Sequence, residues 1–496
     1  PMLLVTPQAA NKTMGQGGFQ EVEQMNLFKD MVCYQEEVRD ASRMAEVLNR
    51  VILKAKRGSA PAQINVPRDF WTQVVDIELP SIIEFERPAG GANAITEAAN
   101  LLSNAKFPVI LSGAGVVLAD AIEECKNIAE KLDAPVACGY QHNDSFPGKH
   151  PLALGPLGYN GSKAAMEIIS KADVVLALGT RLNPFSTLPG YGIDYWPKGA
   201  KIIQVDINSD RIGLAKKISV GICGDAKLVA EQILSQLDST AGDEGREDRK
   251  ALIHQTKSAW LQTLTSLDHE EDDEGTSWNK DSRDRDPDRM SPRMAWRAIQ
   301  AGLPSDAIIS SDIGNNCAIG NAYPTFEQGR KYLAPGLFGP CGYGFPSVLG
   351  AKIGCPDTPV VGFSGDGAFG ISMSEMTSCS REEWPNITMV IFRNYQWGAE
   401  KRNTTLWYDN NFIGTELDPK LSYAKIAEAC GFRGVKVTTQ SELTEALKAS
   451  CVDQMNGVTT FIEVILNQEL GEPFRRDAMK APVEVAGIDS KDTVVQ

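Results

Sequence analysis

The sequence predicts an α/β fold of three doubly wound parallel-sheet domains, of which the first is incomplete. Two observations lead to this prediction. Continuous β-branched and leucine-rich runs, each long enough for one buried strand, alternate with helical segments along most of the chain, which is typical of parallel sheets covered by helices on both faces. The length of 496 residues also allows about three domains at roughly 150 residues each.

The composition is that of a folded globular protein. Hydrophobic residues make up 42% and charged residues 23% of the chain, and no apolar run reaches the roughly 18 residues of a membrane-spanning helix. The net charge of −15 repels a phosphate backbone, so no nucleic acid partner is expected. Ten cysteines without a CxxC pair fit neither a disulfide framework nor a zinc ribbon, so we expect a cytoplasmic protein.

Residues 1–85 are expected to form the C-terminal part of a domain. The run Met2–Thr6 has the apolar character of a central strand and follows neither an initiator methionine nor a signal peptide, so we expect the N-terminal part of this domain to be missing. A glycine-rich loop over 14–20 and a helix come next. A second strand over 62–66 ends at Pro67.

The central α/β domain is expected over residues 86–235. Its helices are predicted over 94–104 and 119–132. Its buried strands are predicted over 108–111, 173–178 and 201–206. The segment Gly113-Ala114-Gly115 after the first of these strands could suggest a dinucleotide loop, but it lacks the third glycine of the GxGxxG pattern.

A solvated linker is expected over 236–290, because its charge runs are too hydrophilic for a core. Its acidic run from Asp268 could suggest a calcium loop. Such a loop needs glycine at its sixth position, which is Asp273 here. A third domain is expected over 291–480 and a mobile tail over 481–496.

The third domain contains a strand–helix–strand unit with polar residues at both strand ends. A strand over 359–363 leads into Gly-Asp-Gly around Asp366, and after a helix over 370–383 a second strand over 387–392 ends at Asn394. A right-handed crossover brings the carboxyl ends of both strands to the same edge of the sheet. We therefore expect Asp366 and Asn394 to face one another.

These two residues predict a magnesium site beside a diphosphate. Carboxylate and amide oxygens suit Mg²⁺ better than zinc, and Mg²⁺ usually completes its shell with substrate phosphates. Gly365 and Gly367 lack the Cβ atoms that would keep the backbone away from phosphate oxygens, and the N–H groups at the start of the following helix attract an anion. Gly-Asp-Gly alone is also common in simple turns, so the spacing to Asn394 is what favours the site.

The spacing of Gly365-Asp366-Gly367 and Asn394 resembles the thiamine diphosphate motif of the acetolactate synthase and pyruvate decarboxylase superfamily. Other segments resemble the superfamily in the same order along the chain. Residues 1–70 are similar to its pyrimidine-binding domain and residues 92–235 to its central domain. The runs 394–403 and 471–477 are most similar to the sulfoacetaldehyde acetyltransferases within it.

This resemblance implies thiamine diphosphate and Mg²⁺ as cofactors. Asp366 and Asn394 would bind the metal with their side chains, and Gln396 would bind it with its backbone carbonyl. The residues that would border the cofactor are Ile313, Gly314, Asn315, Asn316, Gly339, Cys341, Gly365, Gly367, Ala368, Trp397 and Gly398.

The resemblance also implies candidate catalytic residues. Gln20 lies where the superfamily has a Phe-Gln-Glu loop. Cys341 stands where acetolactate synthases commonly have a methionine that supports the aminopyrimidine, and it could take that role or be an inert thiol. Arg475 and Arg476 could bind anionic substrates, because guanidinium groups pair bidentately with sulfonate and phosphate oxygens. The pair Lys401-Arg402 is a second candidate, and either pair could instead only solvate the surface.

The reaction implied by the resemblance converts sulfoacetaldehyde and phosphate into acetyl phosphate and sulfite. The alternatives are a carboligase or decarboxylase of the superfamily, or a non-catalytic cofactor-binding subunit, because the activating glutamate of the superfamily is absent from this chain. The two halves of the cofactor site come from two subunits in the superfamily, so a homodimer or homotetramer is expected, and no membrane partner. Acetolactate synthases bind flavin in the central domain, whereas here a vestigial or nucleotide-free domain is expected.

Overall fold

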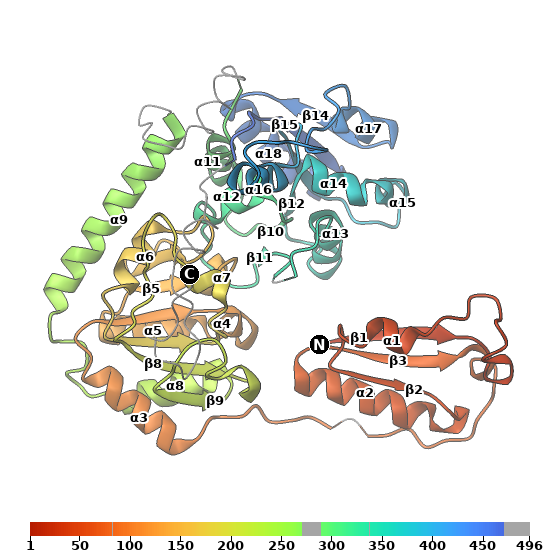
Figure 1. The fold of residues 1–496 in the computed structure, drawn as a ribbon, viewed down its shortest axis with the longest axis horizontal. Helices are drawn as coiled ribbons and strands as arrows, with labels where there is room; N and C mark the ends of the chain where they lie inside the picture. Colours follow the sequence, from red (N-terminus) through yellow and green to blue (C-terminus); the bar gives the residue numbers. More distant parts are fainter. Residues whose placement is uncertain (82, 270–288, 337, 471–496) are drawn as a thin grey trace. The chain divides into compact units, whose positions relative to one another are not determined.

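The computed structural model describes residues 1–81, 83–269, 289–336 and 338–470, which form two compact units (Figure 1). The first unit comprises Pro1–Glu86, and the second begins at Arg87. Residues 270–288 of the predicted linker and the predicted tail over 481–496 lie outside the described residues.

A three-stranded parallel sheet forms the centre of the first unit. Across the sheet its strands are β1 (Met2–Gln8), β3 (Pro61–Pro67) and β2 (Tyr34–Glu37). Helix α1 (Gln24–Phe28) precedes β2. Helix α2 (Met44–Gly58) packs on the sheet because Val47, Val51 and Ala55 recur every four residues and form one buried face.

The second unit contains two further parallel sheets, and the first of them forms the central domain. Its strand order is β6-β5-β4-β7-β8-β9, the arrangement of a doubly wound dinucleotide-type fold. The strands are β4 (Pro108–Ser112), β5 (Val136–Cys138), β6 (Ala153–Pro156), β7 (Val174–Leu178), β8 (Lys201–Asp206) and β9 (Val220–Cys223). The helices are α3 (Ala92–Ser103), α4 (Ala114–Ala119), α5 (Ile122–Leu132), α6 (Lys163–Ile169), α7 (Pro184–Thr187) and α8 (Ala226–Gln236).

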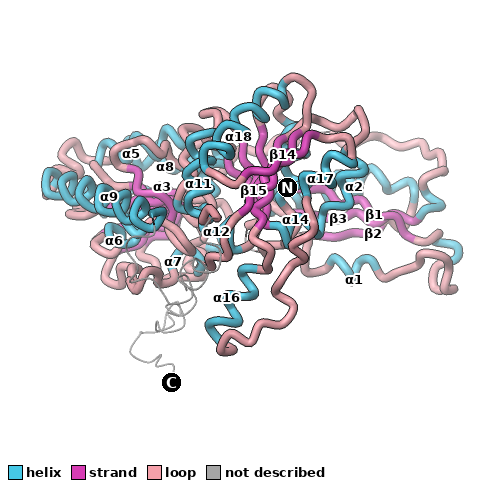
Figure 2. The backbone as a smooth tube through the Cα atoms, turned by 90° about the horizontal axis from the view of Figure 1, so that it is seen from above, coloured by secondary structure: helices cyan, strands magenta, loops and turns pink. Residues whose placement is uncertain are grey.

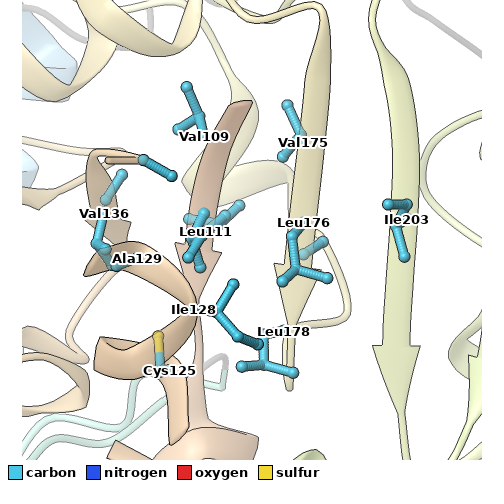
Figure 3. Close-up of a cluster of buried hydrophobic side chains, with 14 of the residues drawn as sticks. Val109, Leu111, Cys125, Ile128, Ala129, Val136, Val175, Leu176, Leu178 and Ile203 are labelled. Carbon is cyan, nitrogen blue, oxygen red and sulfur yellow. The ribbon is translucent and has the colours of Figure 1, made fainter. Parts of the chain in front are cut away.

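Apolar side chains fill the layer between helix α5 and the central sheet. Figure 3 shows Ile128 of α5 beside Leu111 of β4 and Leu178 of β7. All three side chains are fully buried. Every residue of β4 and β7 is buried, which explains why the sequences of these strands are almost continuously apolar.

The second sheet of this unit forms the C-terminal domain, with the strand order β11-β10-β12-β13-β15-β14. The strands are β10 (Ile308–Ser311), β11 (Tyr332–Leu333), β12 (Val360–Gly365), β13 (Thr388–Arg393), β14 (Arg433–Val437) and β15 (Thr460–Ile465). The helices are α11 (Pro292–Gly302), α12 (Asn315–Ile319), α13 (Gly344–Gly354), α14 (Asp366–Ser372), α15 (Met376–Cys379), α16 (Gly398–Trp407), α17 (Tyr423–Ala429) and α18 (Gln440–Met455). Figure 2 shows α16 extending away from the sheet that contains β15.

Helix α9 (Arg246–His269) occupies much of the segment that the sequence predicts as a linker. Ile253 is buried in the core of the central domain, whereas Trp260 and Leu264 are buried in the core of the C-terminal domain. The buried Arg249 guanidinium donates to backbone carbonyl oxygens in the segment just before the helix and in the central domain. These oxygens belong to Lys106, Leu132, Asp133, Gly242 and Glu244. A few apolar residues and one buried arginine thus order a segment whose overall composition is hydrophilic.

Buried polar contacts join the central and C-terminal domains. Asn143 Nδ2 donates to the carbonyl oxygens of Asn321 at 2.8 Å and Pro324 at 2.9 Å. Asp144 Oδ2 accepts the backbone N–H of Lys331 at 2.9 Å. Because buried polar groups tolerate little change in geometry, these contacts fix how the two domains pack.

The parallel-sheet α/β fold predicted from the sequence is confirmed. All paired strands among the described residues run parallel in all three sheets. None of the helices in the described ranges combines the length and the apolar character needed to cross a bilayer.

Candidate active site

The carboxyl ends of β12 and β13 bring two predicted metal ligands to one edge of the C-terminal sheet. The strands are parallel neighbours, and Gly365 at the end of β12 is in register with the penultimate residue of β13. Helix α14 begins at Asp366 rather than at the predicted residue 370, and Asn394 directly follows β13. The backbone N–H of Tyr395 donates to Asp366 Oδ2 at 2.7 Å, so the end of β13 lies against this carboxylate.

The two oxygens of the buried Asp366 carboxylate have different partners. Oδ1 accepts the N–H of Gly367 at 3.0 Å. Oδ2 accepts a charged hydrogen bond from Arg393 Nη1 at 2.9 Å, in addition to the N–H of Tyr395. Burial raises the pKa of Asp366 to about 6, against the opposing effect of the Arg393 charge. Because an ionised carboxylate oxygen can accept two contacts, Oδ1 retains capacity for a further ligand.

Asn394 is the second predicted metal ligand, and its Oδ1 is buried without a hydrogen-bond partner among the described residues. Its Nδ2 donates to Asn316 Oδ1 at 3.5 Å. A buried oxygen without a donor is costly unless a cation binds it. Together with Asp366 Oδ1 it supplies the hard oxygen ligands that Mg²⁺ prefers, so the residues present fit this metal.

Gln396 lies two residues beyond Asn394 and is also buried. Its Nε2 donates to the carbonyl oxygen of Gln468 at 3.1 Å, which ties the side chain to the segment after β15. Its backbone carbonyl is the group that the sequence resemblance assigns to the metal, and this assignment stays a prediction.

Asp312 is a site residue to which the sequence analysis assigns no role. Its Oδ1 accepts the N–H of Ile313 at 2.8 Å and of Gly342 at 3.1 Å, and its Oδ2 accepts the N–H of Gly344 at 2.8 Å and Ser364 Oγ at 3.0 Å. Burial raises the pKa of this carboxyl group. Asp312 thereby joins the segments after β10, before α13 and at the end of β12. Its place directly after a strand was the signal that could have identified it.

The predicted diphosphate loop lies against the predicted metal ligands. Ile313 and Gly314 follow β10, and Gly314 has a φ of +125°, a conformation that favours glycine. Asn315 and Asn316 begin helix α12 and are buried. The contact between Asn316 and Asn394 brings this loop to the edge formed by β12 and β13.

The segment around Cys341 lies beside the same loop. Gly339 has a φ of +60°, and a Cβ added there would lie 3.5 Å from the side chain of Ile313. Cys341 is exposed and has a free thiol. Its neighbour Gly342 donates to Asp312, which anchors the segment. Support of the aminopyrimidine by Cys341 remains a prediction.

The glycines of the Gly-Asp-Gly motif have different surroundings. A Cβ at Gly365 would have no atom within 4 Å, as expected for a position facing a ligand. A Cβ at Gly367 would lie 2.9 Å from the Trp397 ring, so this glycine makes room for a tryptophan. Similarly, a Cβ at Gly398 would lie 3.1 Å from the Asn315 side chain. Ala368 is buried in the first turn of α14.

The candidate substrate residues Lys401 and Arg402 are buried rather than exposed. Lys401 forms an ion pair with Glu416 and donates to Gln468 Oε1 at 3.4 Å. Arg402 donates to Asn315 Oδ1 at 3.4 Å, and its guanidinium carbon lies 4.5 Å from the centre of the Tyr159 ring. Both charges therefore have partners within the fold.

The remaining candidates lie elsewhere in the chain. Gln20 is in the first unit, in an exposed loop, with a φ of +62°. Arg475 and Arg476 lie outside the described residues.

The chain matches known proteins along its length. Residues 95–233 match the family model for the thiamine pyrophosphate enzyme, central domain, and residues 312–464 match that for the thiamine pyrophosphate enzyme, C-terminal TPP binding domain. The whole chain is 76% identical to a probable sulfoacetaldehyde acetyltransferase of Rhizobium meliloti (strain 1021), of which it covers 84%.

The chain is also similar to two further relatives along most of its length. The chain is 74% identical, over 99% of its length, to a sulfoacetaldehyde acetyltransferase of Roseovarius nubinhibens, of which it covers 82%. It is 28% identical, over 90% of its length, to a probable acetolactate synthase large subunit of Methanococcus aeolicus, of which it covers 74%. The chain therefore belongs to the thiamine pyrophosphate enzyme family, in the group that contains the sulfoacetaldehyde acetyltransferases.

Proposed function

We propose that this chain is a sulfoacetaldehyde acetyltransferase that uses thiamine diphosphate to convert sulfoacetaldehyde and phosphate into acetyl phosphate and sulfite. The observation that carries the proposal is the 76% identity, over the whole chain, to a relative with this activity in its name. The site supports the cofactor part, because Asp366 and Asn394 bring hard oxygen ligands to one sheet edge.

The proposed reaction balances without an external oxidant or reductant. The carbon–sulfur bond breaks, sulfite leaves with the bonding electrons, and the methylene carbon gains a proton to become a methyl group. The aldehyde carbon loses its hydrogen as a proton and is oxidised to the level of a carboxylic acid while its neighbour is reduced, and it forms a bond to a phosphate oxygen. When bound, thiamine diphosphate supplies the nucleophilic carbon that attacks the aldehyde.

The residues of this chain would hold and orient the cofactor. Mg²⁺ would be bound by the side chains of Asp366 and Asn394 and by the carbonyl of Gln396. The loop Ile313–Asn316 would border the diphosphate, and Cys341 would support the aminopyrimidine. Asp312 would hold the loop Ile313–Asn316 and the segment around Cys341 in fixed relative positions through its four hydrogen bonds.

The substrates are anionic, whereas the chain carries a net charge of −15. A locally positive site is therefore needed. Arg475 and Arg476 are the candidates for this site. Lys401 and Arg402 are less suited to it, because both already have partners within the fold.

The proposal includes a cytoplasmic homodimer or homotetramer that works on small molecules, with no nucleic acid or membrane partner. The free cysteines of the described residues support a reducing compartment. A shared cofactor site between subunits would make assembly a condition of activity. Light scattering after size-exclusion chromatography distinguishes a dimer or tetramer from a monomer.

The decisive experiment is product analysis with the full-length protein, thiamine diphosphate and Mg²⁺. We expect sulfite and acetyl phosphate in equal amounts from sulfoacetaldehyde and phosphate, and neither product from Asp366→Ala. Acetolactate from pyruvate, without sulfite from sulfoacetaldehyde, would instead identify a carboligase. No turnover of either substrate would favour a non-catalytic cofactor-binding subunit.

A further inference from the structure

Arg393, the last residue of β13, is fully buried between two carboxylates. Its Nη1 donates to Asp366 Oδ2 at 2.9 Å, and its Nε lies 3.8 Å from Glu463 Oε1 on the neighbouring strand β15. Its Nη2 donates to the backbone carbonyl oxygens of Asp418 and Leu421. The guanidinium is therefore held from three directions.

The groups around this arginine are themselves fixed. Glu463 Oε2 accepts Ser422 Oγ at 2.7 Å and the N–H of Ala424 at 3.1 Å. The Tyr423 hydroxyl donates to the backbone carbonyl of Asp366 at 2.7 Å. The rings of Tyr395 and Tyr423 lie 4.3 Å and 5.4 Å from the Arg393 guanidinium carbon. Two strands, the start of α14 and the segment 418–424 thus form one rigid network.

This network limits which oxygens of the Asp366 carboxylate are available to a metal ion. Oδ2 already accepts two hydrogen bonds, from Arg393 and Tyr395, whereas the one donor to Oδ1 within the described residues is the N–H of Gly367. Since each carboxylate oxygen has about two acceptor sites, Oδ2 has no capacity left for a metal while both of its hydrogen bonds persist. Mg²⁺ requires near-octahedral geometry, whereas Ca²⁺ is larger and accepts bidentate carboxylates.

We propose that Arg393 is a positioning residue that holds Asp366 Oδ2, so that the carboxylate binds the metal through Oδ1 alone and the site prefers Mg²⁺ to Ca²⁺. This inference rests on the proposed function, since it takes Asp366 as a metal ligand. Glu463 contributes by holding the arginine, not by binding the metal.

The test compares the full-length protein with Arg393→Lys and Arg393→Met after removal of bound metal by a chelator. Calorimetric titration gives the affinities for Mg²⁺ and for Ca²⁺ in the presence of saturating thiamine diphosphate. We expect Arg393→Met to weaken Mg²⁺ binding by about 10- to 100-fold, as is typical when a group that orients a metal ligand is lost. Ca²⁺ binding should weaken less, so the ratio of the two affinities falls.

The lysine variant and a control separate positioning from a general structural role. Arg393→Lys keeps one charged donor for Asp366 but cannot reach both carbonyl oxygens, so its affinity ratio should lie between those of the wild type and Arg393→Met. If Arg393→Met does not fold, comparison of Arg393→Lys with the wild type still tests the inference. Arg433→Met, which removes an exposed arginine paired with Asp453, should leave both affinities unchanged.

Two results would overturn the inference. An unchanged Mg²⁺ affinity in both Arg393 variants would show that Arg393 does not position the ligand. An equal loss of Mg²⁺ and Ca²⁺ affinity would assign it a structural role only. In both cases the wild type binds metal and cofactor, so the proposed function stands. A wild type that binds neither metal with thiamine diphosphate would instead contradict the proposed function and with it the inference.

Discussion

Asp312 Oδ2 accepts the backbone N–H of Gly344 at 2.8 Å, and a Cβ at residue 344 would lie only 3.1 Å from that oxygen. The contact connects the end of β10 with the start of α13. The same carboxylate also accepts the N–H of Gly342 and Ser364 Oγ. A single buried carboxylate therefore sets the relative positions of three segments that border the proposed cofactor site.

We predict that Asp312→Ala lowers both stability and cofactor affinity. The substitution leaves several buried donors without an acceptor, and each such donor costs about 1–3 kcal/mol. Urea unfolding should show a loss of about 3 kcal/mol in the free energy of unfolding, and calorimetry should show weaker binding of thiamine diphosphate. Asp306→Ala, at an exposed position, is the matched control. Unchanged unfolding of Asp312→Ala would contradict the proposed linking role.

We predict that Gly367→Ala weakens cofactor binding because the new methyl group collides with the Trp397 ring. Its Cβ would lie 2.9 Å from that ring, and overpacking of this kind typically costs about 1–3 kcal/mol. Titration with thiamine diphosphate measures the loss of affinity. If binding is as tight as in the wild type, the close packing of Trp397 does not constrain the site.

Gly350→Ala provides the control for this substitution. Gly350 lies on the exposed face of α13, and a Cβ there would have no atom within 4 Å. Alanine is favoured over glycine within a helix by about 1 kcal/mol. This variant should therefore be slightly more stable than the wild type and should bind the cofactor equally well.

The strands that the sequence predicted are those with long apolar runs. Strands β4, β8 and β13 lie within one residue of their predicted ranges. Strand β2 was missed because its sequence Tyr-Gln-Glu-Glu has no apolar run, and β5 because it has three residues. The helix predicted over 119–132 begins only at Ile122 as α5, after Asp120, which has a φ of +57°, and the short helix α4 before this break was not predicted. Such a local break has no clear signal in the sequence, because aspartate also occurs within helices.

The candidate site could be predicted only in part. The rule that parallel strands end at a common edge was enough to bring Asp366 and Asn394 together. The roles of Asp312 and Arg393 depend on contacts with Gly344, Asp418 and Leu421, which come from other segments of the chain. Spacing along the sequence does not show such contacts, so a positioning residue is found only when the fold is known.

We predict that the glycines of the central domain serve packing rather than nucleotide binding. The N–H of Gly115 donates to the Gly179 carbonyl at 2.8 Å, and a Cβ at Gly115 would lie 2.6 Å from Gly179 Cα. Gly115→Ala should therefore lower the free energy of unfolding by about 1–3 kcal/mol. Gly199→Ala is the control. A Cβ at Gly199 would have no atom within 4 Å, so this substitution should not lower the free energy of unfolding.

The same hypothesis predicts that flavin and adenine nucleotides do not bind to the purified protein. Absorbance and fluorescence titrations with flavin adenine dinucleotide measure this directly. Saturable binding that Gly115→Ala abolishes would show that the loop is a functional nucleotide site, and the packing role would then be secondary.

We predict that His142 makes the protein less stable in mild acid. Burial lowers the pKa of His142 to about 4, whereas the ordinary value is 6.5. Between these two values the unfolded chain binds a proton that the folded chain excludes, so the free energy of unfolding falls as the pH is lowered from 6.5 to about 4. Above pH 6.5 the residue is neutral in both states, and this contribution to the pH dependence vanishes.

Replacement of His142 by Gln isolates this contribution from the carboxylates that titrate over the same range. The slope of the free energy of unfolding against pH should become shallower by up to about 1.4 kcal/mol per pH unit, the value for one proton. His254→Gln, at an exposed position on α9, is the control and should follow the wild-type curve. If His142→Gln and the wild type keep the same slope between pH 4 and 6.5, the His142 ring takes up its proton in the folded protein, and burial does not exclude it.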